Sequence, residues 1–296
     1  MTAPRQVLPG TYLVTRRCAQ RQFLLTPSAI TNQVFLYLLA VAAGRYGVEV
    51  HAFCILSNHY HLVVTDAHAR LPAFQQFLDG LVARAVNASL GRWEAFWAPD
   101  SYSAVRLATA ADVIEKIAYV LVNPVAAGLV ASGDLWPGLR SAPALIGGDA
   151  LEVERPEHFF DPAGPLPDRV RLRVTTPSGF GSADRLRAEL APAIARREDE
   201  ARAEWHARGG FVGARRVLAQ EPTARARSTE PKRALNPRVA VHDKWKRIEV
   251  LGRLVEFLRA YRRAWLARRA GERDALFPAG TYQLRVMHGV PCAASS

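Results

Sequence analysis

The sequence has few cysteines and no long apolar run, and each shortage excludes a class of protein. Its cysteines, Cys18, Cys54 and Cys292, are odd in number and far apart, so neither a disulfide framework nor a zinc site with short cysteine spacing is expected. No apolar run approaches the roughly 20 residues of a membrane span, and no apolar block follows basic residues at the N-terminus. We therefore expect a soluble, cytoplasmic protein with no membrane partner.

Acidic residues are too few to balance the basic ones in the second half of the chain. Residues 1–160 carry 12 basic and 12 acidic residues, whereas residues 161–296 carry 27 and 15, so the whole net charge of +12 lies there. The excess is mostly arginine, whose planar guanidinium suits phosphates and stacked bases. This composition favours a nucleic-acid partner, although an arginine-rich solvated surface would give it too.

Strand and helix patterns alternate up to about residue 125. β-Branched and aromatic runs predict strands, and apolar residues spaced at three and four predict helices. Strands are expected over residues 11–14, 48–56, 59–65 and 102–107, and helices over residues 28–46, 70–90 and 109–122, the last ended by Pro124. The first six elements, β-α-β-β-α-β, are those of the ferredoxin-like plait, an α+β fold in which helices cover one face of an antiparallel sheet.

The pattern changes after residue 135. Residues 136–181 are rich in proline and glycine, which indicates a linker or an extended wrap. Residues 182–296 contain two charged helical stretches, over 182–208 and 241–269, and form a basic, mostly helical extension. We expect the plait to occupy residues 8–135 and the two other segments to follow it.

Two histidines lie one residue apart in the strand pattern HYHLVVT (residues 59–65). Since side chains alternate along a strand, His59 and His61 share a face while Tyr60 points away. Buried imidazoles need partners for their ring nitrogens. The pair can chelate one divalent cation and leave positions open for phosphate oxygens, or it can be structural.

Tyr119 and Asn123 lie four residues apart, on one face of the helix that precedes Pro124. A half-buried aromatic residue with an asparagine cap is one interpretation. The other is chemical, because a phenol can attack phosphorus when a metal polarises the phosphodiester and helps the proton leave.

These motifs together resemble the IS200-like transposase family, and within it the REP-associated tyrosine transposases. The resemblance rests on HAFCILSNHYHLVVT (residues 51–65), YSAV (residues 102–105) and YVLVNPVAAGLV (residues 119–130), supported by YLVTRR (residues 12–17). It covers about residues 8–135. His-x-His alone is a weak signal, whereas His-x-His on a strand with Tyr-x-x-x-Asn-Pro-Val near the end of a helix is a strong one.

The resemblance implies a DNA-cleaving domain that binds single-stranded or hairpin DNA. His59 and His61 would be the metal ligands, Asn123 the counterpart of the family's third ligand, and Tyr119 the nucleophile that forms a 5′-phosphotyrosine and frees a 3′-OH. We expect Mg²⁺ or Mn²⁺ as the ion and no nucleotide cofactor. Both a monomer and a homodimer fit the sequence.

Arginines near the N-terminus are candidates for DNA contacts. The first 21 residues contain four basic and no acidic residues, and Arg16, Arg17 and Arg21 are expected to bind phosphates beside the site; solvated surface arginines are the alternative. The basic residues 182–296, which interleave tryptophan and tyrosine with arginine, are expected to hold DNA outside the cleavage site.

Two other functions stay open. The chain could be a DNA-hairpin-binding regulator that kept the fold and lost catalysis. It could also be a small-molecule metalloenzyme on the same plait, with Tyr119 merely structural.

Overall fold

The computed structural model describes residues 4–99, 102–157, 159–226 and 238–294. Its first six elements after the N-terminal segment follow the predicted order β-α-β-β-α-β. They are β1 (Gly10–Arg17), α1 (Ala29–Tyr46), β2 (Val48–Leu56), β3 (His59–Asp66), α2 (Leu71–Ser89) and β4 (Ser103–Leu107). The α+β plait predicted from the sequence is therefore confirmed.

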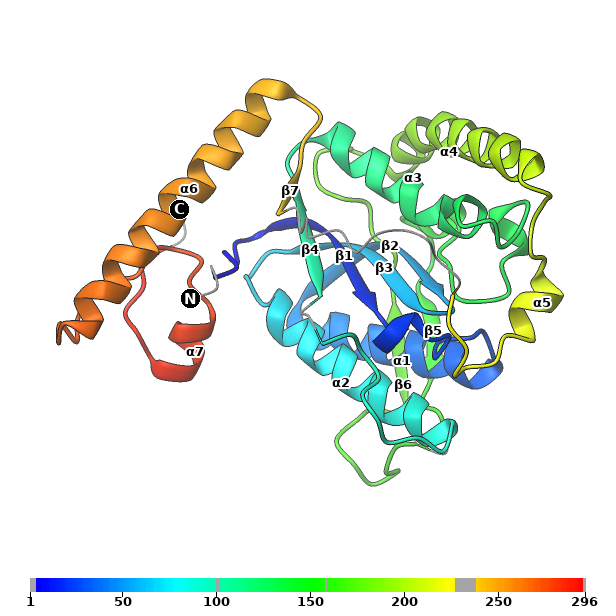
Figure 1. The fold of residues 1–296 in the computed structure, drawn as a ribbon, viewed down its shortest axis with the longest axis horizontal. Helices are drawn as coiled ribbons and strands as arrows, with labels where there is room; N and C mark the ends of the chain where they lie inside the picture. The colour runs from blue at the N-terminus through cyan, green and yellow to red at the C-terminus, as the bar shows by residue number, and fades with distance from the viewer. Residues whose placement is uncertain (1–3, 100–101, 158, 227–237, 295–296) are drawn as a thin grey trace.

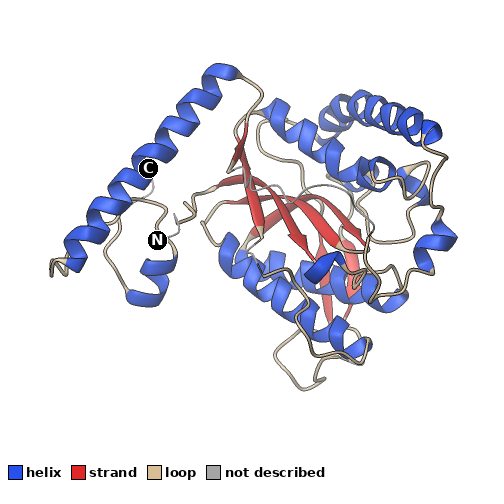
Figure 2. Cartoon of the chain, viewed as in Figure 1, coloured by secondary structure: helices blue, strands red, loops and turns tan. Residues whose placement is uncertain are grey.

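The main sheet has the order β2-β3-β1-β4-β7. β1 runs antiparallel to both β3 and β4, and β2 and β3 form a hairpin. The fifth strand, β7 (Val239–Ala240), pairs in parallel with β4 and comes from the second half of the chain. Figures 1 and 2 show α1 and α2 below the sheet and α3 (Ala110–Ala126) above it. The plait's own helices thus share one face, as expected, and α3 covers the other.

Local signals in the sequence set the ends of the early elements. Ser28 caps α1 by accepting a hydrogen bond from the Thr31 N–H at 3.0 Å. Gly47 ends the helix in the left-handed conformation, with a φ of 64°. The chain then enters β2 directly, and Ser57 and Asn58 turn it back into β3.

α3 continues past the point where the sequence predicts its end. Thr109 and Asp112 form a reciprocal capping box at its start. The expectation that Pro124 ends the helix is wrong: Pro124 lies inside it, and α3 runs to Ala126. A proline removes one N–H and crowds the preceding turn, but here the helix has only two further residues, and buried packing holds the last turn in place.

Residues 136–181 lie against the plait and contribute to its core. Trp136, Ile146 and Val174 are buried, and Thr175 donates its N–H to Val50 O at 2.8 Å. The segment contains the ribbon of β5 (Leu151–Glu154) and β6 (Arg169–Leu172), which packs on α1. Short 3-10 helices occur at Ala19–Arg21, Gly133–Leu135 and Pro143–Leu145.

Residues 182–296, grouped by the sequence into one extension, divide into two parts. α4 (Ala183–Ala207) packs along α3 and buries Leu186 and Leu190 in the main core, and α5 (Ala214–Leu218) follows it. α6 (Lys244–Arg269) and α7 (Gln283–His288) lie to one side, beyond β7 (Figure 1). They enclose a separate small core around Phe257, Tyr261 and Phe277.

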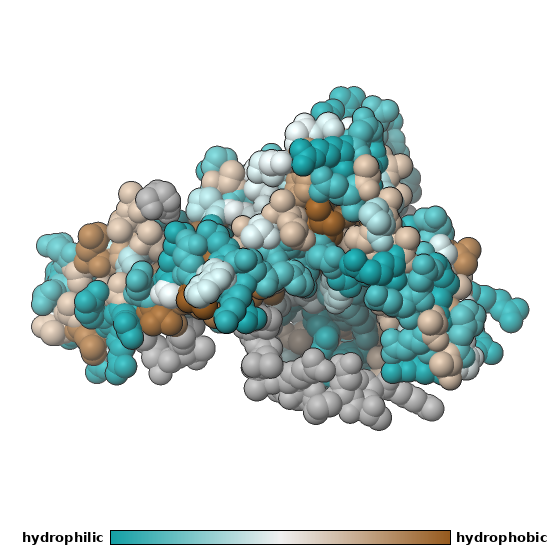
Figure 3. Space-filling view, turned by 90° about the horizontal axis from the view of Figure 1, so that it is seen from above, coloured by the Kyte–Doolittle hydropathy of each residue, from teal (hydrophilic) through white to brown (hydrophobic). Residues whose placement is uncertain are grey.

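The part built from α6 and α7 leaves many apolar side chains in contact with solvent. At the left end of Figure 3, hydrophobic surface lies beside hydrophilic surface. Exposed apolar residues in α6 and the segments after it are Trp245, Ile248, Leu251, Val255, Leu266, Leu276, Val286 and Met287. Throughout the described part of the chain, no helix has the length and apolarity that crossing a membrane demands.

Candidate functional site

His59 and His61 project from β3 toward α3, on the face of the sheet away from α1 and α2. Their rings are 4.8 Å apart between centroids and nearly perpendicular. Tyr60 points the other way, where its hydroxyl donates to Gln75 at 2.9 Å and to Asp79 at 2.6 Å, both in α2. The alternation predicted from the sequence is therefore present.

Tyr119 meets the histidine pair from α3. Its ring centroid lies 5.2 Å from that of His61, so two residues 58 positions apart in sequence are in contact. Asn123, one turn further along α3, is buried, and its side-chain amide lies close enough to the Tyr119 phenol to lower the pKa of that group. All four residues singled out by the motifs thus gather at one place between β3 and α3.

The imidazole nitrogen nearer the backbone, Nδ1, has a partner in both histidines that fixes the ring. The His59 Nδ1 lies 2.6 Å from Asn58 Oδ1, an acceptor, which makes Nδ1 the protonated nitrogen and leaves the lone pair on Nε2. The His61 Nδ1 lies 2.7 Å from the Thr15 hydroxyl. The His61 Nε2 is buried and has no hydrogen-bond partner among the described residues. Asn58 and Thr15 thereby fix the orientation of the two imidazole rings.

The electrostatic surroundings keep both imidazoles neutral. Burial, assisted by the charge of Arg17, lowers the pKa of His59 to about 4. Burial also holds the pKa of His61 well below its usual range, and the neighbouring His59 and Arg17 add to this effect. A neutral imidazole with a free lone pair is the form that binds a metal ion.

Burial raises the pKa of the Tyr119 phenol, so the free side chain is protonated at neutral pH. Three neighbours act in the opposite direction and lower this pKa: the Asn123 amide and the positive charges of Arg17 and Arg197. The Lys116 ammonium, one turn earlier on α3, lies 5.7 Å from the Tyr119 ring centroid. Positive charge is therefore available on this side of the phenol to stabilise an anion.

The three arginines expected to bind phosphates lie in different places. Arg17 is exposed and pairs with His59 across β1 and β3, so its side chain shares the face of the site. Arg16 points to the opposite face, where its guanidinium lies 3.7 Å from Asp79, so its expected place beside the histidines is wrong. Arg21 contributes its backbone, since its carbonyl accepts from Asn58 Nδ2 at 3.4 Å.

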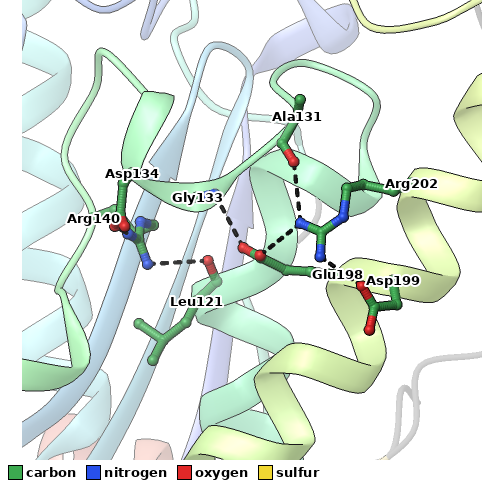
Figure 4. Close-up of polar contacts among 8 residues, drawn as sticks. All are labelled: Leu121, Ala131, Gly133, Asp134, Arg140, Glu198, Asp199 and Arg202. Carbon is green, nitrogen blue, oxygen red and sulfur yellow. Dashed lines mark hydrogen bonds and ion pairs between the residues drawn. The ribbon is translucent and has the colours of Figure 1, made fainter.

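α4 and the loop after α3 hold the tyrosine-bearing helix. Glu115 of α3 forms ion pairs with Arg196 and Arg197 of α4. Figure 4 shows Glu198 of α4 accepting from the Gly133 N–H at 3.1 Å, while Arg202 of the same helix donates to Ala131 O at 3.4 Å. α3 is thus tied to α4 by ion pairs, and the loop after α3 by contacts to its backbone.

Gly128 brings the last turn of α4 against the end of α3. It adopts a φ of +70°, and a Cβ built on it would lie 2.4 Å from the Trp205 ring. The Trp205 indole N–H donates to Ala126 O at 3.0 Å. Only glycine allows this close approach without a shift of the ring.

Sequence reasoning missed the supporting residues Thr15, Asn58 and Lys116. Lys116 could have been found from its i, i+3 spacing to Tyr119. Thr15 could not, because it meets His61 through the register of β1 on β3, which spacing along the chain does not reveal. Within the described residues, no three His, Cys, Asp or Glu side chains gather into a metal-binding group. Besides the two histidines, the motif residues supply one further group that could bind a metal ion, the amide oxygen of Asn123.

Comparisons with known proteins give partial structural matches. No family model matches the chain, and the search of curated proteins finds no relative. One similar solved structure is a REP-associated tyrosine transposase bound to a REP hairpin, with 19% identity over 47% of this chain and 80% of that chain, at a TM-score of 0.38. Another is a candidate transposase from Deinococcus radiodurans R1, with 19% identity over 38% and 89% of the two chains, at a TM-score of 0.29. The chemistry of the site is therefore inferred from its own residues.

Proposed function

We propose that this chain is a metal-dependent DNA transposase, or a domesticated relative of one, that cleaves and rejoins single-stranded or hairpin DNA through Tyr119. One observation carries the proposal: two neutral imidazoles and a phenol, from strand and helix elements far apart in sequence, meet at one place. The motif resemblance to the IS200-like transposases names the same three residues.

The reaction assigned to Tyr119 is a transesterification. Its oxygen forms a bond to the phosphorus of a DNA phosphodiester, and the bond from phosphorus to the 3′ oxygen breaks. The phenol loses its proton and the leaving 3′ oxygen gains one, so charge and atoms balance. The 5′-phosphotyrosine keeps the energy of the broken ester, and attack by a 3′-OH reverses the step.

The residues present fit a divalent cation, either Mg²⁺ or Mn²⁺. His59 and His61 would hold it through Nε2, with the Asn123 amide oxygen as a third donor, since the orphaned and buried His61 Nε2 is otherwise without a partner among the described residues. When bound, the ion would polarise the scissile phosphodiester.

The protein's own groups supply orientation and charge. Thr15 and Asn58 fix the imidazole rings, and the neighbouring Asn123 amide favours the ionised form of the Tyr119 phenol. Arg17 and Lys116 place positive charge beside the phenol, where negative charge grows as the proton leaves. Exposed Arg17 is also positioned to contact a phosphate of the bound strand.

An adduct assay tests the proposal. The protein is incubated with end-labelled hairpin DNA carrying a single-stranded flank, with Mn²⁺, and a species that survives denaturation is sought. We expect the adduct with the unchanged protein and its loss in Tyr119→Phe. Tyr60→Phe is the matched control. It also removes a phenol hydroxyl, but Tyr60 lies on the strand of His59 and His61 and points to the opposite face of the sheet.

The outcomes separate the alternative functions. Adduct in the unchanged protein that persists in Tyr119→Phe would contradict the assignment of the nucleophile. A gel shift with no adduct in any protein would favour a hairpin-binding regulator. Neither shift nor adduct would favour a small-molecule metalloenzyme, with Tyr119 in a structural role.

A further inference from the structure

A second cleft lies on the other face of the sheet, at the edge where β4 pairs with β7. Its volume is about 390 Å³, and it is bounded by the N-terminal segment, β4, β7 and α6. Tyr12 and Ala104 line it; they alternate with Leu13 and Val105, whose side chains face the α3 side of the sheet with Thr15. The cleft is therefore separate from the histidine–tyrosine site.

Four arginines from four separate segments converge on this cleft, which we name the arginine cleft. They are Arg5 of the N-terminal segment, Arg106 of β4, Arg238 just before β7 and Arg253 of α6. None of the described lining residues is acidic. Because the sequence has an equal number of acidic and basic residues before residue 160, this concentration of one sign depends on the fold bringing the segments together.

Neutral groups hold the arginines in place, with one exception. The Arg5 guanidinium donates to Tyr102 O at 2.5 Å and lies 4.5 Å from the Tyr102 ring centroid. Arg106 donates to Pro9 O at 3.5 Å and lies across Gly10, whose missing side chain leaves it room. Arg253 is the exception, since it pairs with Glu249 one turn earlier on α6. Three of the four guanidinium groups therefore form no ion pair with a carboxylate of the described residues.

The crowding of like charges is unfavourable without an anion. Burial lowers the pKa of Arg238, and the charge of Arg5 lowers it further. Its backbone carbonyl accepts from the Arg106 N–H at 3.0 Å, which fixes the backbone of Arg238 at the edge of β4. A phosphate placed between the Arg5 and Arg238 guanidinium groups would remove their repulsion and accept hydrogen bonds from both.

The remaining lining suits a base. Val7, Leu71, Val239 and Leu254 give the cleft an apolar wall beside the Tyr102 ring. Cationic groups next to aromatic and apolar side chains are the combination with which proteins bind single-stranded nucleic acid, with phosphates on the charges and bases against the rings. The volume is also within the range of pockets that enclose a small ligand.

We propose that the arginine cleft binds a nucleotide of a single DNA strand, with its phosphate between Arg5 and Arg238 and its base against Tyr102. The inference rests on the proposed function only for the identity of the partner. The site lies on the opposite face from His59 and His61, so it holds DNA that is not being cut.

The test is a binding titration that needs no cleavage. Tyr119→Phe protein is titrated with fluorescent single-stranded DNA at salt concentrations from about 50 to about 200 mM. The cleft double variant Arg106→Gln/Arg238→Gln is compared with Arg169→Gln/Arg171→Gln, which removes two exposed arginines of β6 and so the same net charge. A second cleft variant, Arg5→Gln/Arg253→Gln, guards against a local folding defect, and circular dichroism checks each protein.

We expect both cleft variants to bind about tenfold more weakly at low salt. The slope of log affinity against log salt should fall by about 0.7 in each, the value for one lost phosphate contact on a single strand. The β6 variant should keep the slope of the parent. Equal slopes and affinities in cleft and β6 variants would overturn the proposal. Unchanged DNA affinity combined with loss of binding to free dTMP would also overturn it, because the ligand would then be a mononucleotide.

The experiment separates this inference from the proposed catalysis. If no protein forms the Tyr119 adduct and the cleft variants still lose affinity and slope, the cleft assignment stands and the catalytic one fails. If adduct forms and the cleft variants bind like the β6 variant, the reverse holds.

Discussion

Replacing Gly128 by alanine tests whether α4 fixes the end of the tyrosine-bearing helix. Two costs are expected. An alanine at a φ of +70° is strained by roughly 1–2 kcal/mol. Its Cβ would also lie 2.4 Å from the Trp205 ring, and relieving such overpacking costs about 1–3 kcal/mol.

Gly91 provides the matched control. It lies just after α2 with a φ of +63°, and a Cβ on it meets nothing within 4 Å. Gly91→Ala therefore carries the strain without the clash. We expect Gly128→Ala to lower the free energy of unfolding by about 1–3 kcal/mol more than Gly91→Ala does, measured by equilibrium urea denaturation with unchanged slopes.

A third variant locates the clash. In a Trp205→Ala background the ring is absent, so Gly128→Ala should cost only what Gly91→Ala costs, a non-additivity that a double-mutant cycle measures directly. Equal destabilisation by Gly128→Ala and Gly91→Ala in the protein with Trp205 would refute the claim that the approach of α4 demands glycine.

Three further predictions follow from buried groups and from the division of the C-terminal half. Tyr60→Phe should leave adduct formation intact but lower the free energy of unfolding by about 1–3 kcal/mol, because Asp79 loses the hydroxyl that donates to it. An unchanged free energy of unfolding in urea denaturation would contradict this. Burial lowers the pKa of His51 from 6.5 to about 4, so the unfolded chain takes up the proton at a higher pH than the folded one. The free energy of unfolding should therefore fall by up to about 3 kcal/mol as the pH drops from 6.5 to 4. His51→Gln should flatten this part of the plot of stability against pH, and an identical slope in the variant would count against the role of His51. Deleting residues 182–296 should abolish folding, since α4 is part of the main core. Deleting residues 243–296 should leave a protein that is folded by circular dichroism, because α6 and α7 enclose a separate core. A folded product of the longer deletion would contradict the assignment of α4 to the main core.

Much of the fold follows from local patterns in the sequence. The strand pattern of residues 59–65 places His59 and His61 on one face through its period of two, and Ser28 and Gly47 mark the ends of α1. The contact between His61 and Tyr119 does not follow from spacing, since 58 residues separate them; family resemblance, not periodicity, linked the two.

The errors have physical causes that sequence alone hides. Arg16 was expected beside the histidines, but its position opposite Tyr60 in the β1–β3 register points it to the other face. Pro124 usually ends a helix, and here tertiary packing of the last turn overrides that preference. The two-residue strand β7 carries no pattern of its own and exists only because β4 offers an edge.

α4 illustrates how charge can conceal a core helix. Its sequence is dominated by alternating charged residues, which favoured a basic helical extension, yet a narrow stripe containing Leu186, Leu190 and Ala193 is buried against the main body. The charged residues on its flanks then pair with α3 and the loop after it. A stripe of this width is sufficient because α3 supplies the rest of the apolar surface.

The contacts between the two ends of the chain determine when the arginine cleft can form during synthesis. The side chain of Gln6 donates to Ala279 O, although 273 residues separate the two positions. β4 can pair with β7 only after more than half of the chain that follows β4 has been synthesised. The strands and helices that carry His59, His61 and Tyr119 all precede residue 127, and the helix that packs on them ends at residue 207. Since domains fold from the N-terminus as the chain emerges from the ribosome, we expect the histidine–tyrosine site to form first and the arginine cleft last.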